Sequence, residues 1–125
     1  SLTLSGSTVY VEAELYTKSF SLAIKNSTTT SNPAAQHSIP TAITITKVKC
    51  WSSQTITFQL DERAEDTPQT AGTDIMSATL SCGATTASTT SFTNAGISAN
   101  NWISLDIDTG SATTTAINIS YTIDD

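Results

Sequence analysis

Residues 54–80 read QTITFQLDERAEDTPQTAGTDIMSATL, and we expect the rest of the chain to be organised around them. Every second residue over 56–60 is apolar and the residues between are polar, which is the period of a strand with one buried face. Five charged residues then crowd together, a proline and a glycine interrupt the backbone, and apolar residues resume at Ile75. The stretch therefore predicts a strand, an acidic loop over 61–73 and a second strand.

The composition favours a sheet. The chain has 125 residues, the size of one domain, and most of its aliphatic residues are β-branched like its many threonines. Such side chains suit a pleated sheet and slightly penalise a helix. Charged residues make up 13% of the chain, against roughly 25% in soluble domains. Serine and threonine, about a third of the sequence, are therefore expected to keep the surface hydrated.

The charge and hydropathy exclude two kinds of partner. The formal net charge is −6 and the chain has only five basic residues. Because phosphate binding needs clustered lysine and arginine, we expect no nucleic-acid partner. No stretch approaches the eighteen or so continuous apolar residues of a membrane span, and no charged leader precedes an apolar run. We therefore expect a soluble chain with no membrane partner.

The periodicity predicts about eight short strands. Their ranges are 8–16, 20–24, 41–51, 55–62, 74–82, 89–92, 102–108 and 117–123. The first two are close enough along the chain to form a hairpin, and residues 26–40, with two prolines and no period, are expected to form the longest loop. The apolar parity changes within 41–51, which predicts a β-bulge near Thr46 or Lys47. We expect an all-β fold, an antiparallel β-sandwich of jelly-roll type in a single domain over residues 1–125.

No catalytic or metal-binding pattern emerges, so we expect a protein that is not an enzyme and has no cofactor. His37, the only histidine, lies between prolines without a glycine-flanked serine or a second histidine. The acidic groups offer the oxygens that calcium prefers but lack the spacing of a calcium loop, so we expect a solvated surface and no metal site. These groups are Asp61, Glu62, Glu65 and Asp66, and also Asp106 and Asp108. The last two are expected on the solvent face of a strand, without the cleft that acid–base catalysis requires.

The cysteines and tryptophans leave alternatives open. Cys50 and Cys82 each lie near the end of an expected strand. A disulfide between them would lower the entropy of the unfolded chain and so stabilise the fold by about 3.5 kcal/mol. The strand order is needed to choose between a disulfide and two buried free thiols. Trp51 and Trp102 are either part of the core or its rim, or exposed platforms that stack on sugar rings.

Four ordered motifs carry a resemblance. They are DERAE at 61–65, TAGTD at 70–74, SFTNAGISANNW at 91–102 and ISYTID at 119–124. With these motifs, residues 41–125 resemble the C-terminal part of small β-sandwich structural proteins of tailed bacteriophages, especially those from environmental and marine phage genomes. The resemblance implies a virion component, such as a capsid decoration, a head fibre or a tail or baseplate part, and it offers no catalytic residue.

Three functional hypotheses follow. The first is a non-enzymatic structural protein of a tailed-phage virion, located in an extracellular particle and acting through contacts with other virion proteins. The alternative is a carbohydrate-binding module of a secreted or adhesive protein, with Trp51 and Trp102 as the stacking residues. A second alternative is an extracellular filament subunit that donates its first strand, which includes residues 9–15, to a neighbour.

The virion hypothesis predicts self-association. Its expected form is a homo-oligomer, with a trimer as the first choice because phage decoration proteins and fibres are often threefold, an argument that comes from the resemblance. Loops carry recognition on a rigid sandwich. We therefore expect residues 26–40 and 61–73 to contact other virion proteins.

Overall fold

The computed structural model describes residues 2–5, 8–11, 17–29 and 32–124, which form strands and turns without a helix. The strands are β1 Leu2–Ser5, β2 Thr8–Val11, β3 Lys18–Ser27, β4 Ala35–Ser38, β5 Ile43–Ser52, β6 Ile56–Arg63, β7 Thr73–Asp74, β8 Leu80–Cys82, β9 Ala87–Thr89, β10 Gly96–Ile97, β11 Trp102–Gly110 and β12 Ala112–Ile123.

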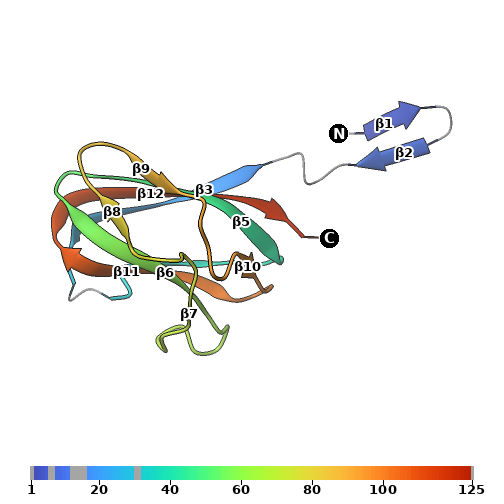
Figure 1. Ribbon diagram of the computed structural model, residues 1–125. Coiled ribbons are helices and arrows are strands. Elements are labelled where there is room, and N and C mark those ends of the chain that lie inside the picture. The colour runs from blue at the N-terminus through green and yellow to red at the C-terminus, as the bar shows by residue number, and fades with distance from the viewer. Residues whose placement is uncertain (1, 6–7, 12–16, 30–31, 125) are drawn as a thin grey trace.

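Two antiparallel sheets of five strands face each other (Figure 1). The first has the order β10-β5-β12-β3, with β9 also paired to β5, and the second has the order β4-β11-β6-β7, with β8 also paired to β6. The predicted all-β antiparallel sandwich is confirmed. Its two sheets contain ten strands rather than about eight, because the predicted strand over 74–82 divides into β7 and β8, and β4 and β10 are too short to give a readable period, while β2, within the predicted strand over 8–16, pairs only with β1.

The core lies between the sheets and is built mainly from isoleucine. Alternate residues of the long strands β5, β6, β11 and β12 are buried, as the period of a strand requires. The predicted bulge is confirmed: Ser120 of β12 pairs with Lys47, but the next residue, Tyr121, pairs with Ile45. Thr46 is therefore the extra residue, and it keeps Ile45 and Val48 both facing the core.

A disulfide joins the two sheets. Cys50 of β5 and Cys82 of β8 are bonded, with their Cα atoms 5.9 Å apart. Since β5 belongs to one sheet and β8 pairs with β6 of the other, the bond connects the two layers across the core. Of the two states that the sequence left open, the structure has the bridged one.

The N-terminal pairing differs from the prediction. β2 pairs with β1, whereas β3 pairs with β12, so the expected hairpin between the first two predicted strands is wrong. β3 extends to Ser27 and pairs with β12 from Lys18 to Ser27, a longer ladder than the predicted strand over 20–24 could form. Figure 1 shows the β1–β2 hairpin apart from the sandwich. Part of the segment proposed for strand donation, residues 9–15, lies outside the described residues.

The predicted loop over 26–40 is also partly wrong, because it contains β4, which pairs with β11. The side chain of Asn32 begins this pairing: its amide donates to the Ile107 carbonyl oxygen at 2.9 Å and its carbonyl accepts from the Ile107 amide at 2.8 Å. The Asn32 side chain thus takes the place of a backbone residue in the ladder. The apolar period of the sequence does not show pairing of this kind.

The predicted strand over 74–82 is wrong as one element, since β7 and β8 are separate. Between them the side chain of Gln59 bonds both backbone groups of Met76, accepting from its amide at 3.0 Å and donating to its carbonyl at 3.1 Å. This pair replaces the backbone ladder to β6. β11 and β12 are joined through the single residue Ser111, next to Gly110, whose φ of 83° a residue with a Cβ rarely adopts.

An anchored loop and an aromatic face as candidate functional sites

The sandwich presents two distinct outer surfaces. The strands and loops of the β4-β11-β6-β7 sheet carry the carboxylates Asp61, Glu62, Glu65, Asp66, Asp74, Asp106 and Asp108, with Arg63 as the only cation. The strands of the other sheet carry Lys18, Lys25, Lys47 and Lys49 and no carboxylate. The described carboxylates therefore belong to one sheet and the lysines to the other, except for Asp124, which follows β12 and accepts from the Thr44 hydroxyl of β5 at 2.6 Å.

Residues 64–72, here called the anchored loop, fold onto the outer face of the β4-β11-β6-β7 sheet, here called the acidic sheet, beside β7 in Figure 1. Three side chains from three strands donate to its backbone. Gln36 of β4 and Arg63 of β6 both donate to the Pro68 carbonyl, at 2.6 and 3.0 Å. The indole N–H of Trp102 in β11 donates to the Glu65 carbonyl at 3.0 Å. The loop is thus exposed in its side chains but fixed in its backbone.

The buried side chain of Arg63 links the anchored loop to two carboxylates of the sheet. It is 5% exposed, and its Nε lies 2.9 Å from Oδ2 of Asp61, which is 2% exposed. Its Nη2 lies 3.1 Å from Oδ2 of Asp106. The amide of Gly72 donates to Asp61 Oδ2 at 2.8 Å, so the buried carboxylate also ties down the end of the loop. A buried ion pair of this kind contributes little net energy, but it is costly to break.

The position of Gly72 requires glycine. A Cβ at this residue would overlap the carbonyl oxygen of Glu62 and approach the Cα of Arg63 to 3.2 Å. Both atoms belong to the backbone of β6, so neither can move aside without disturbing the sheet. The loop therefore returns to β7 in closer contact with β6 than any side chain permits.

The half-buried carboxylate of Asp106 differs from its expected solvated state. Its side chain is 28% exposed and accepts two hydrogen bonds from Nη2 of Arg63, at 3.1 and 3.2 Å. Burial raises the pKa of Asp106, the nearby Asp61 carboxylate raises it further, and Arg63 opposes the rise. Asp108, by contrast, is exposed as expected.

Glu62 organises the end of the sandwich next to the loop. Its carboxylate accepts from the side-chain amide of Asn94 at 2.9 Å, from the backbone amide of Ser98 at 2.9 Å and from the side-chain amide of Asn101 at 2.8 Å. Burial alone would raise the pKa of Glu62, but the three hydrogen bonds outweigh it and hold the pKa below its ordinary value. The ionised carboxylate is therefore part of the fold.

These positions correct the expected solvated acidic loop over 61–73. Asp61, Glu62 and Arg63 belong to β6, and the loop begins at residue 64. Only Glu65 and Asp66 remain as exposed charges on the loop. In the described part of the chain no three histidine, cysteine, aspartate or glutamate side chains converge as metal ligands do. Arg63 occupies the centre of the acidic group, where a cation would otherwise be expected.

The two tryptophans have different environments. Trp51 of β5 is 37% exposed on the lysine-bearing sheet, and its indole N–H donates to the Ala84 carbonyl at 3.0 Å. Trp102 is half-buried and its N–H is bonded to the anchored loop. Only Trp51 presents a large exposed apolar surface of the kind that stacks on a ligand. Trp102 has a structural role under the loop.

His37 is an aromatic packing residue. Its ring stacks on Phe20 with the centroids 4.1 Å apart and the planes 11° from parallel. The pair closes the gap between β3 and β4, which are edge strands of the two sheets. Phe20 also lies 5.8 Å from Tyr121, so the three rings form one cluster at this edge.

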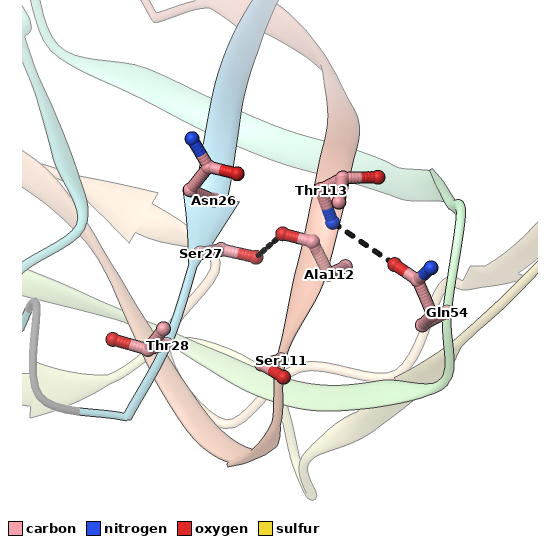
Figure 2. Close-up of a pocket in the computed structure, with 7 residues that line it drawn as sticks. All are labelled: Asn26, Ser27, Thr28, Gln54, Ser111, Ala112 and Thr113. Carbon is pink, nitrogen blue, oxygen red and sulfur yellow. Dashed lines mark hydrogen bonds between the residues drawn. The ribbon is translucent and has the colours of Figure 1, made fainter.

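A hollow of about 400 Å³ lies at one end of the sandwich (Figure 2). It is lined by Asn26, Ser27, Thr28, Gln54, Ser111, Ala112 and Thr113. Figure 2 shows that its polar groups bond to one another: the Ser27 hydroxyl donates to the Ala112 carbonyl at 3.4 Å, and Gln54 accepts from the Thr113 amide at 2.9 Å. None of the lining residues is charged, so the lining offers no general base to activate its serine and threonine hydroxyls.

The chain matches no protein-family description, no curated protein and no solved structure. No helix in the described residues is long and apolar enough to cross a membrane. Among the described residues, we take the anchored loop and the face around Trp51 as the candidate surfaces for recognition. The sequence left Trp51 open between core or rim packing and an exposed platform, and the structure has it exposed. The roles of Gln36 and Gly72 in fixing the loop became visible only in three dimensions.

Proposed function

We propose that this chain is a non-enzymatic structural protein of a tailed-phage virion that contacts other virion subunits through the anchored loop. The observation that carries the proposal is an exposed loop whose backbone is fixed by side chains from three strands. A pre-organised loop loses little conformational entropy on binding, so its contacts give more net affinity than those of a flexible loop. We propose a tailed-phage virion as the particle because residues 41–125 resemble small structural proteins of tailed bacteriophages.

Two further features support a role in an extracellular particle. The disulfide between Cys50 and Cys82 is of the type that persists in oxidising surroundings. The strand faces are rich in hydroxyls and low in charge, so they can pack against other subunits without burying many unpaired ions. The proposal includes a homo-oligomer, with a trimer as its first form.

Mass spectrometry of purified particles tests the virion role, and absence of the chain from them would contradict it. Chemical cross-linking of the same particles tests the contact. We expect cross-links from the vicinity of Glu65 and Asp66, and expect the variant with both residues changed to lysine to be incorporated poorly. The matched control is Lys25→Glu, an exposed charge change on the other sheet. Equal incorporation of both variants would exclude the loop as the contact.

Light scattering tests the proposed oligomer. A chain of 13.1 kDa that forms trimers should show about three times that mass at tens of micromolar. A mass near 13.1 kDa would show that the chain does not assemble unaided.

The exposed indole of Trp51 favours a second candidate function, binding of a carbohydrate. An aromatic ring fixed at its edge by a hydrogen bond offers a rigid flat surface at little entropic cost. A glycan array with the Trp51→Ala variant tests this function, and Trp102→Ala is the matched control because that indole lies under the loop. No binding by the parent chain, or equal binding by both variants, would exclude it.

A further inference from the structure

We infer that the outer surface of the β3-β12-β5 sheet binds an acidic polysaccharide, with Trp51 stacking on a sugar ring and lysines pairing with its carboxylates. This inference rests on the second candidate function and names the class of glycan. The surface is called the lysine face and consists of the outward side chains of the three strands, among them Lys25, Lys47, Lys49 and Trp51.

The aromatic part of the face is open on one side. Across the sheet, Trp51 is in register with Ala116 of β12, which in turn is in register with Ala23 of β3. Both partners are too small to cover the indole, and a hollow of about 120 Å³ lies beside it. The bond from the indole N–H to Ala84 fixes the ring, so the open surface is held ready for a flat ligand.

The polar part of the face follows in the next rows of the sheet. Lys49 is in register with Asn118 and Asn118 with Ser21, and these three residues also line the hollow beside Trp51. One row further, Lys47 is in register with Ser120. Ammonium, amide and hydroxyl groups thus extend from the aromatic ring along one flat surface. This combination matches a ligand that has ring faces, hydroxyls and carboxylates.

The charge of the face favours an acidic ligand although the chain as a whole is negative. In the described part of the chain every salt bridge involves Arg63, so no carboxylate there is paired with Lys25, Lys47 or Lys49. The acidic outer face is separated from the lysine face by two sheets, which pack about 10 Å apart. The Debye length at physiological salt is about 8 Å, so a ligand on Trp51 experiences mainly the lysines. Asp124, the one described carboxylate bonded to this sheet, accepts from Thr44 at the opposite end of β5 from Trp51.

A glycan fits this surface better than a nucleic acid. Nucleic-acid surfaces combine several stacking rings with a longer basic track. The lysine face has one exposed tryptophan and three lysines, surrounded by serine, asparagine and alanine. Those hydroxyl and amide groups are suited to the many hydroxyls of a sugar chain.

The test compares two probes with the same sugar backbone, polygalacturonate and its highly methyl-esterified form, by affinity electrophoresis and calorimetry. We expect the parent chain to bind polygalacturonate at least about tenfold more tightly than the ester, since charge-assisted bonds are lost in the ester. The double variant Lys47→Gln/Lys49→Gln and the single variant Trp51→Ala should each lose about tenfold or more. Lys18→Gln, an exposed change at the start of β3, and Trp102→Ala should bind like the parent.

The other outcomes exclude either the acidic class of glycan, the carbohydrate function or the glycan site. Equal binding of both probes would exclude the acidic class and leave the carbohydrate function standing, whereas binding of neither probe or of any arrayed glycan would exclude that function as well. Equal or tighter binding of oligo-deoxythymidine, unaffected by Trp51→Ala, would show a nonspecific charge effect and overturn the glycan site. Since Lys47 and Lys49 are exposed, their variant should keep the parent unfolding temperature and so separates binding from folding. The presence of the chain in virions is measured independently of all these results.

Discussion

Replacing Arg63 with methionine should be among the most destabilising single changes in this chain. The substitution removes the partner of Asp61 at a site where the carboxylate is 2% exposed and cannot regain water without opening the loop. It also removes one of the two donors to the Pro68 carbonyl. Breaking a buried pair by removing one partner costs about 3–5 kcal/mol. Domains have a total stability of about 5–15 kcal/mol, so the loss is a large fraction of the whole.

Urea denaturation followed by tryptophan fluorescence measures this loss. For a slope of about 1.5 kcal/mol/M, the expected shift of the midpoint is about 2–3 M to lower urea. The matched control is Lys47→Met, which removes an exposed cation with no carboxylate partner in the described residues. Its expected effect is below about 0.5 kcal/mol.

A double variant separates the loss of the charge pair from the loss of packing. In Arg63→Met/Asp61→Asn the buried charge is gone, and the asparagine carbonyl can still accept from Gly72. We expect the double variant to be at least about 1–2 kcal/mol more stable than Arg63→Met alone, because residue 61 is then neutral and no unpaired charge is buried. A cost below about 1 kcal/mol for Arg63→Met, or no recovery in the double variant, would refute the reasoning.

Three further predictions concern the loop, the disulfide and the pH dependence. Gly72→Ala should lower stability by about 1–3 kcal/mol in the same urea assay, while Ala71→Gly, one residue earlier, should change it much less. Cys82→Ala should cost about 2–5 kcal/mol, and reduction of the parent chain should reproduce most of that loss. Because the pKa of Glu62 is lowered in the folded state, its stabilisation is present above the unfolded pKa of about 4.3 and is lost as the pH falls through the folded value. In the Glu62→Gln variant the free energy of unfolding should therefore fall less steeply with decreasing pH than in the parent. An unchanged slope at acid pH would contradict this role of Glu62.

The sheet architecture was predictable because its signal is local. β5, β6 and β11 carry apolar residues at alternate positions, and the predicted ranges 41–51, 55–62 and 102–108 lie within two residues of their observed bounds, whereas β12 begins at Ala112, five residues before the predicted range 117–123. The bulge at Thr46 was also readable, because an extra residue shifts the parity of every apolar residue after it. Strand order was not readable, and so neither the β3–β12 pairing nor the disulfide could be decided from the sequence.

The candidate sites were less predictable because they depend on contacts between distant segments. The run of charges at 61–66 is typical of a solvated loop, and nothing local shows that Arg63 and Asp61 lie under residues that follow them. Gln36 and Trp102 reach the loop from 32 and 37 residues away along the chain. Trp51 was a candidate from its residue type, but the sequence left its exposure open because the choice between core and surface depends on the face of the strand. Its small neighbours across the sheet required the register.

The central claim is that residues 64–72 form a fixed surface even though their side chains are exposed, and hydrogen exchange tests it most directly. The amide of Gly72 donates to the buried Asp61 carboxylate. In the parent chain we expect this amide to exchange at least about 100-fold more slowly than in an unstructured peptide. In Arg63→Met, measured where that variant is still folded, the protection should be lost within 64–72 and retained in β11 and β12. Exchange of the parent Gly72 amide at the unstructured rate would contradict the claim.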